Sequence, residues 1–318
     1  MKTHLHILNK LADPSFYKTL PKHLMVHSGW YRNLFEDAFR IQGIQQHLDI
    51  INLGSNPAKF AFDYSGTGVK GFNLAVGPQT LTYDFRMLKN YHSFLDDNGA
   101  RIVILGLSFC SFCKDRYTER DGDISRGLRY YPILHRAMID GFDEKTYDTF
   151  IEHPERLGMK SWAKAILRKR TDSLTITNNP LTEEEMDTAA IGMINCWKRE
   201  FSIKSFNVSD LSQEVKDSLT YNSGVLDQII SFCKERDIKP VVTVLPVSNT
   251  LNKYFNVEFR KHCLLSILES KNIQVLNYAA DARFTDDANF QDELKMNLTG
   301  RRKFTAQVIS DLKRLNYL

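Results

Sequence analysis

Five short apolar runs, separated by segments of helical periodicity, constrain the fold of this chain more than any other feature of its sequence. Such runs, without polar alternation, are typical of strands that are covered on both faces. Several of the intervening segments place apolar residues three and four positions apart, as amphipathic helices do. A strand, a helix and a second strand in succession form a parallel crossover unit. The five runs are residues 50–54, 69–75, 101–107, 240–245 and 273–278.

This alternation predicts an α/β fold, a three-layer α/β/α sandwich with a five-stranded parallel sheet in the order 2-1-3-4-5. Residues 1–49 show helical spacing, which predicts a helical N-terminal extension packed on the main domain of residues 50–318. Between about 109 and 215 no comparable strand occurs, and charged and aromatic pieces predict a helical insertion. We expect this 109–215 insertion to cover the sheet as a lid or to offer a surface to a protein partner.

Composition narrows the classes of function. The chain is 42% hydrophobic and 25% charged, which is typical of a globular protein. Its net charge of +4 is mild, and no basic block is interleaved with aromatic residues, so nucleic-acid binding is not predicted. No apolar run reaches the length of a membrane span, and residues 1–10 lack the apolar core of a signal peptide. A cytoplasmic protein is therefore expected, with any membrane association made through partners.

Metal and cofactor motifs are weak. Cys110 and Cys113 form a CxxC pair, but the chain has five cysteines and no second pair, so a zinc site is poorly supported. Reduced, buried cysteines are the favoured interpretation. The sequence has no HExxH, no phosphate-binding loop and no GxGxxG, so neither a metal nor a cofactor is predicted.

The first apolar run ends in Gly54-Ser55-Asn56, and a helix is expected to open at Pro57. The carboxyl ends of parallel strands meet at one edge of the sheet, which is where open α/β sheets bind ligands. Ser55 is therefore a candidate for chemistry at this edge. Its other interpretation, as a turn residue that satisfies backbone donors, is favoured by the residues alone.

Two further segments join this turn in a family resemblance. Gly71-Phe72-Asn73-Leu74-Ala75 follows the turn, and the pattern Phe290-x-Asp292-x-x-Lys295-x-Asn297-x-x-Gly300 precedes the last expected helix. In order and spacing these motifs resemble the SGNH/GDSL hydrolase superfamily. The likeness is closest to its bacterial cell-envelope branch, which includes proteins of D-alanyl transfer and alginate O-acetylation. It covers roughly residues 50–110 and 220–318.

The resemblance implies a catalytic set and a set that holds the substrate or its oxyanion. A serine hydroxyl is a weak nucleophile and needs a base that a third group orients, and the developing oxyanion needs fixed donors. The catalytic set that it implies is Ser55, Asp292 and Lys295. The substrate and oxyanion set that it implies is Asn56, Asn73, Ser108 and Asn297.

The chain departs from the family pattern at decisive positions. Lys295 stands where the family has its histidine base, and a strict alignment places Asn56, not Ser55, at the nucleophile. Lys295 would act as a base only if burial lowered its pKa, and pairing with Asp292 is the favoured alternative. His92, His135 and His262 are the other candidates for a base, although a structural role is favoured for each.

Two functions from different classes follow. The first is an esterase or O-acyltransferase linked to bacterial surface polysaccharide, a link that rests on the resemblance. The second is a non-catalytic pseudoenzyme that binds a small acyl or glycan ligand, or a partner protein, at the same place. A third, a flavodoxin-like nucleotide-binding module, is weaker because no phosphate loop is present. The sequence does not reveal the substrate or the oligomeric state.

Overall fold

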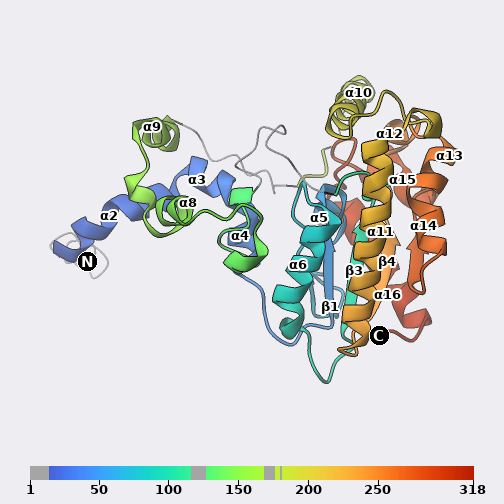
Figure 1. Ribbon diagram of the computed structural model, residues 1–318, viewed down its shortest axis with the longest axis horizontal. Coiled ribbons are helices and arrows are strands. Elements are labelled where there is room, and N and C mark those ends of the chain that lie inside the picture. Colours follow the sequence, from blue (N-terminus) through green and yellow to red (C-terminus); the bar gives the residue numbers. More distant parts are fainter. Residues whose placement is uncertain (1–13, 116–126, 168–175, 180) are drawn as a thin grey trace. The chain divides into compact units, whose positions relative to one another are not determined.

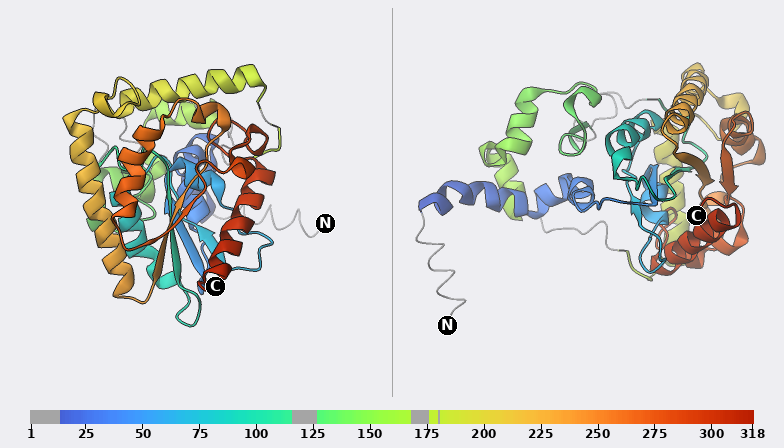
Figure 2. Two further views of the ribbon diagram at one scale, coloured as in Figure 1. Left: turned by 90° about the vertical axis from the view of Figure 1, so that its right-hand side faces the viewer. Right: turned by 90° about the horizontal axis from the view of Figure 1, so that it is seen from below.

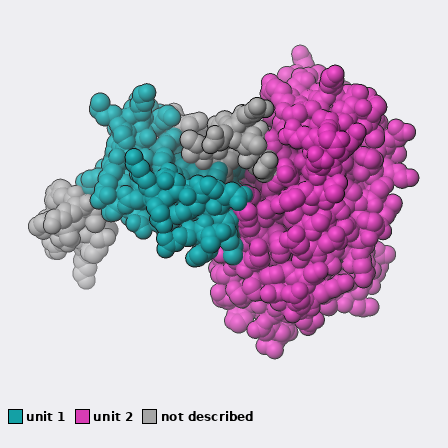
Figure 3. Space-filling model, viewed as in Figure 1, with its two compact units in different colours: residues 1–43, 123–175 teal, residues 44–122, 176–318 magenta. Residues whose placement is uncertain are grey.

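The computed structural model, drawn in Figure 1, describes residues 14–115, 127–167, 176–179 and 181–318. The chain divides into two compact units (Figure 3). Unit 1 comprises residues 1–43 and 123–175, and unit 2 comprises residues 44–122 and 176–318.

Unit 2 is a parallel α/β sandwich. All strand pairs in its sheet are parallel, and the strand order is β2-β1-β3-β4-β5. Both the parallel sheet and its order confirm the prediction from the apolar runs. The strands are β1 (Ile50–Gly54), β2 (Gly71–Asn73), β3 (Ile102–Leu107), β4 (Lys239–Val244) and β5 (Gln274–Asn277).

Helices cover the sheet on both faces, so every residue of β1 and β3 is buried. Helix α5 packs against α16 on one face, while α6 packs against α11 on the other (Figures 1 and 2). The helices of unit 2 that bear on the site are α5 (Asn56–Ala61), α6 (Leu81–Tyr91), α10 (Glu183–Glu200), α11 (Gln213–Lys234), α12 (Asn249–Asn252) and α16 (Leu298–Arg314). Three shorter helices are α13 (Val257–Arg260), α14 (Ser266–Glu269) and α15 (Ala282–Thr285).

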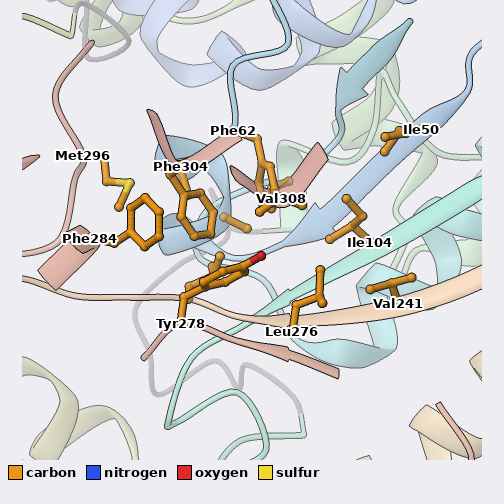
Figure 4. Packing of buried hydrophobic residues seen from close by; sticks show 14 of the residues in the cluster. Ile50, Phe62, Ile104, Val241, Leu276, Tyr278, Phe284, Met296, Phe304 and Val308 are labelled. Carbon is orange, nitrogen blue, oxygen red and sulfur yellow. The ribbon is translucent and has the colours of Figure 1, made fainter. Parts of the chain in front are cut away.

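An aromatic cluster fixes α16 on its face of the sheet (Figure 4). The ring of Phe304 meets the rings of Tyr278 and Phe284 at centroid distances of 5.2 and 5.4 Å, both nearly perpendicular. Phe62 approaches the same ring from the end of α5 at 5.6 Å. Edge-to-face pairs of this kind add to the stabilisation that burial provides. The cluster therefore holds the segment that contains Asp292 close to the end of α5.

Helix α11 begins at a local capping signal. It runs from Gln213 to Lys234. Ser212 is its N-cap, because the Ser212 Oγ accepts a hydrogen bond from the Val215 amide at 3.3 Å.

Unit 1 is helical. Its two chain segments are joined by a hydrogen bond from the Tyr31 hydroxyl to the Phe150 carbonyl at 2.7 Å. Its elements are α2 (Pro14–His27), α3 (Gly29–Leu34), α4 (Glu36–Ile41), α8 (Glu144–Tyr147), α9 (Met159–Leu167), the π-helix η4 (Asp148–Glu152) and the short 3-10 helices η3 (Arg136–Met138) and η5 (Pro154–Arg156).

The division into units differs from the predicted one. The N-terminal extension was expected to pack on the main domain, with 109–215 as a single insertion. Instead, residues 1–43 form a compact unit with residues 123–175, while residues 176–215 belong to unit 2. The physical reason is that elements of the two segments contact one another: α2 contacts η5, α3 packs on α9, and the Tyr31 hydroxyl donates to the Phe150 carbonyl.

We expect Gly54→Ala to destabilise the protein by about 3 kcal/mol or more. Gly54 has a φ of +134°, and a Cβ there would lie 2.4 Å from the Gly106 carbonyl oxygen and 2.6 Å from the Ala58 Cβ. Urea unfolding followed by circular dichroism measures the change. The matched control is Gly224→Ala in α11, where a Cβ meets nothing within 4 Å. This control should be neutral or stabilising by up to about 1 kcal/mol, and equal losses in both variants would contradict the expectation.

Candidate functional site

The turn after β1 places Ser55 at the carboxyl edge of the sheet. Ser55 is the N-cap residue of α5, and its carbonyl accepts the first helical hydrogen bond from Lys59 at 3.0 Å. Its hydroxyl oxygen accepts a hydrogen bond from the backbone amide of Gln79 at 3.1 Å. The Ser55 side chain therefore holds the loop that follows β2, which is the structural role that the sequence left open.

Asn56 is the first residue of α5 and faces the same loop. A Cβ on Gly77 would lie 1.6 Å from the Asn56 Oδ1, so the Asn56 amide occupies the space that a side chain at position 77 would need. Gly77 is thus the residue that lets the loop after β2 lie directly against Asn56. Both side chains of the turn, Ser55 and Asn56, consequently face the loop after β2.

A buried carboxyl lies behind the turn. Asp84 on α6 is 3% exposed and accepts hydrogen bonds from the Gly54 amide and from the Gln79 side chain. Burial raises the pKa of Asp84 to about 7, although both hydrogen bonds oppose this rise. The sequence reasoning did not identify Asp84 as a site residue. The available signal was an acidic residue on the side of a helix that also carries Leu81 and Leu88, both of which are buried.

The Asp292 loop lies just before α16 and is closed by its own hydrogen bonds. The Gln291 amide donates to the Lys295 carbonyl at 2.8 Å. Asp292 Oδ1 accepts from the amides of Leu294 and Lys295 at 3.1 and 2.7 Å, the pattern of an aspartate-stabilised turn. The other oxygen, Asp292 Oδ2, lies 2.9 Å from Lys295 Nζ in an ion pair. One carboxylate therefore shapes the turn and also binds the lysine.

Lys295 also reaches α5. Its Nζ lies 5.3 Å from the centre of the Phe60 ring, within cation–π range, and its side chain is 37% exposed. The acidic loop and the Ser55 helix are thus neighbours, as the family pattern requires. Among the described residues, however, no hydrogen bond joins the Ser55 hydroxyl to Lys295 or to a histidine. The Ser–Lys pair that catalysis would need is not formed.

Glu293 adds a second carboxyl to this loop. It is 7% exposed, and burial raises its pKa, with the neighbouring charge of Asp292 acting in the same direction. Lys295 acts in the opposite direction. Glu293 is therefore a buried carboxyl whose pKa lies above its usual value.

Asn73 is part of the scaffold. Its Oδ1 accepts from the Asn52 side chain at 2.8 Å and from the Ala75 amide at 3.0 Å. Its Nδ2 donates to the carbonyls of Ala58 and Lys59 at 3.2 and 3.1 Å. Asn73 thereby connects two strands with the carbonyl end of α5, and these bonds occupy the amide that was predicted to meet a substrate.

Asn297 and Ser108 also bond to their own loops. Asn297 is the N-cap of α16, with its Oδ1 accepting from the Gly300 amide and its Nδ2 donating to the Ala288 carbonyl, both at 2.8 Å. The Ser108 amide donates to the Ser111 Oγ at 2.8 Å. These contacts stabilise the loops that end at the carboxyl edge.

The three other candidates for a base lie in three different elements. His92 Nδ1 lies 3.0 Å from the Lys89 carbonyl at the end of α6. His135 caps η3 in unit 1 through the Ala137 amide at 3.3 Å. His262 is exposed within the π-helix of residues 261–265.

Helix α10 crosses the carboxyl edge (Figure 2). The chain before it is bonded to the acidic loop through the Leu181 amide and the Gln291 carbonyl at 3.3 Å, and Met186 is buried in the core cluster. Beside α10 and α12 lies a hollow of about 290 Å³. Aromatic, amide and ammonium side chains line it, including Phe206, Tyr254, Phe255, Asn207, Asn256, Lys198 and Lys253.

Among the described residues, one group has metal-ligand spacing: Asp148, Glu152 and His153 of unit 1. The CxxC pair is buried, and the Cys113 thiol shares hydrogen bonds with Cys110 and Cys263. The contact with Cys110 and burial hold the pKa of Cys113 well above its usual range, although the contact with Cys263 acts in the opposite direction. Both thiols of the pair therefore pack as small buried side chains.

Together, the fold and the site define a parallel α/β protein with a polar carboxyl edge covered by a helix. No protein-family model matches the chain, and no curated protein matches it. The likeness to the SGNH/GDSL superfamily therefore stays a prediction that rests on the motifs.

We expect Asp84 to make the protein less stable as the pH rises from about 4 to about 7. Because its folded pKa of about 7 lies above the unfolded value, the folded state binds the extra proton in this window. The stabilisation is complete at lower pH and is lost as the pH passes through the folded pKa. Asp84→Asn removes this titration, so its stability relative to the parent should rise by up to about 4 kcal/mol between pH 4 and 8.

Urea unfolding across this pH range measures the effect. The matched control is Asp217→Asn on the exposed side of α11, which removes a carboxyl without touching the turn. A difference between the Asp84 variant and the parent that stays constant with pH would contradict the expectation.

Proposed function

We propose that the chain is a binding protein with an SGNH-like fold that holds its ligand in the hollow beside α10 and α12, without Ser55-dependent hydrolysis. The observation that carries the proposal is the ion pair of Lys295 and Asp292 at 2.9 Å, together with the Ser55 hydroxyl bound to the Gln79 amide. The side chains that would act as base and nucleophile are both engaged in holding loops.

The chemistry follows from the donor and acceptor roles. A general base must offer a lone pair within hydrogen-bond reach of the hydroxyl proton. In the described part of the chain, the Lys295 side chain is paired with Asp292 and makes no hydrogen bond to the Ser55 hydroxyl. The pair therefore supports recognition of an oxygen-rich ligand, through its donors and acceptors, rather than removal of the hydroxyl proton.

A glycan is the ligand class that the side chains support best. The hollow beside α10 and α12 combines the ring of Tyr254, which is 38% exposed, with Lys198 and with the amide of Asn207, whose Oδ1 accepts from the Asn256 Nδ2 at 2.8 Å. Aromatic faces pack against the apolar faces of sugars, while amides and lysines bond to hydroxyl and carboxylate groups. The link to bacterial surface polysaccharide comes from the family resemblance, and esterase or O-acyltransferase activity is the alternative that the tests address.

We expect the double variant Asn56→Ser with Lys295→His to gain hydrolysis of p-nitrophenyl acetate, by at least about tenfold over the parent. The two changes supply the nucleophile and base types of the family pattern at the positions that a strict alignment gives. Each single variant should stay at the parental rate, because a nucleophile and a base act as a unit.

The parent and Ser55→Ala are the controls. Equal rates in these two are expected, since Ser55 holds the Gln79 amide and attacks no substrate. If Ser55→Ala hydrolyses the ester at least about tenfold more slowly than the parent, the protein is an esterase and the proposal is wrong. A folded double variant without any gain would contradict the alignment with the family.

We expect Tyr254→Ala to weaken glycan binding by at least about tenfold, because it removes the exposed ring of the hollow. Screening the parent on an array of acidic and neutral bacterial oligosaccharides identifies a binder, and titration calorimetry compares the variants. The matched control is Tyr221→Ala on α11, where the ring is 51% exposed and lies outside the hollow. Absence of any oligosaccharide binder, or equal losses in both variants, would contradict a glycan site in this hollow.

A further inference from the structure

Helix α9 of unit 1 carries an exposed apolar strip. Met159, Ile166 and Leu167 are 90, 77 and 81% exposed, although each is a large apolar side chain. At about 100° per residue these positions and Ala163 fall on one continuous side of the helix. Large apolar residues that gather in one exposed strip mark an interaction surface, whereas scattered ones do not.

The opposite side of α9 is held within unit 1. Helix α9 packs on α3, and the Trp162 Nε1 donates to the Glu155 carbonyl at 3.3 Å. Ser161, Trp162 and Ala165 are partly buried. These contacts fix the orientation of α9 within unit 1 and leave its apolar strip exposed.

The positive charge beside the strip indicates the kind of surface that the strip binds. Lys160 and Lys164 are exposed and lie along one border of the strip. Unit 1 as a whole contains sixteen Lys and Arg against eleven Asp and Glu, while unit 2 contains twenty-six against twenty-seven. The positive excess of the chain thus belongs to the unit that exposes the apolar strip. An apolar strip bordered by lysines is the pattern of helices that lie at anionic membrane surfaces.

We infer that α9 docks unit 1 on an anionic phospholipid surface, with Met159, Ile166 and Leu167 entering the boundary between headgroups and acyl chains. Among the described residues, no helix has the length and apolar character to cross a membrane. A nine-residue helix spans roughly 13 Å, less than half of a bilayer core, so α9 would lie in the plane of the surface. The inference is independent of whether the carboxyl edge binds or hydrolyses its ligand.

Vesicle co-sedimentation of the full chain tests the inference. We expect binding to phosphatidylcholine vesicles that contain about 30% phosphatidylglycerol and much weaker binding to pure phosphatidylcholine. The double variant Ile166→Asp with Leu167→Asp should lower the partition coefficient by at least about tenfold. The double variant Lys160→Glu with Lys164→Glu should lower binding to the vesicles that contain phosphatidylglycerol and leave binding to pure phosphatidylcholine unchanged. Because all four side chains are exposed, the variants should keep the parental circular dichroism spectrum.

The matched control is Val257→Asp on unit 2, where the side chain is also apolar and 78% exposed. It should bind vesicles as the parent does. Failure of the parent to bind anionic vesicles would overturn the inference, as would equal losses in the control. Concentration-dependent self-association of the parent that Ile166→Asp with Leu167→Asp abolishes, without vesicle binding, would assign the strip to a second copy of the chain instead.

Discussion

Close packing at the end of β1 is the constraint on which the site depends. Gly54 and Gly106 lie side by side in neighbouring strands, and a Cβ on Gly106 would lie 2.7 Å from the Ala58 Cβ. Three small residues therefore let α5 begin directly on the sheet edge. This start places Ser55 and Asn56 against the loop after β2, and larger side chains here would move the helix away.

Two sets of polar contacts lie at the carboxyl edge, one at the turn after β1 and one in the Asp292 loop. The Ser55 hydroxyl and the Asp84 carboxyl hold the turn to the loop after β2 through Gln79. On the other side, Asp292 shapes its own loop and binds Lys295, whose ammonium lies near Phe60 of α5. The edge thus carries a serine turn and an acidic loop, and the side chains of both hold backbone and charge.

The sheet was predictable because its signals are local. An apolar run identified each strand, and for β1 the predicted and observed boundaries are the same. The crossover rule then left few possible strand orders. That Ser55 and Asp292 lie at one edge followed from the same topology. The partners of these side chains did not follow, since Gln79 and Asp84 reach Ser55 and Gly54 from a different element. The grouping of residues 1–43 with residues 123–175 did not follow either, because contacts such as that between Tyr31 and Phe150 join residues that are far apart in sequence, where no periodicity reveals them.

The central claim is that Ser55 is a structural residue of a binding site. Intact-mass spectrometry after treatment with a fluorophosphonate probe tests it most directly, because the probe reacts with a serine hydroxyl only when a neighbouring base activates it. We expect no adduct on Ser55, under conditions that fully label a serine esterase added as a standard. A stoichiometric adduct that peptide mapping places on Ser55 would contradict the claim and identify the protein as a serine hydrolase.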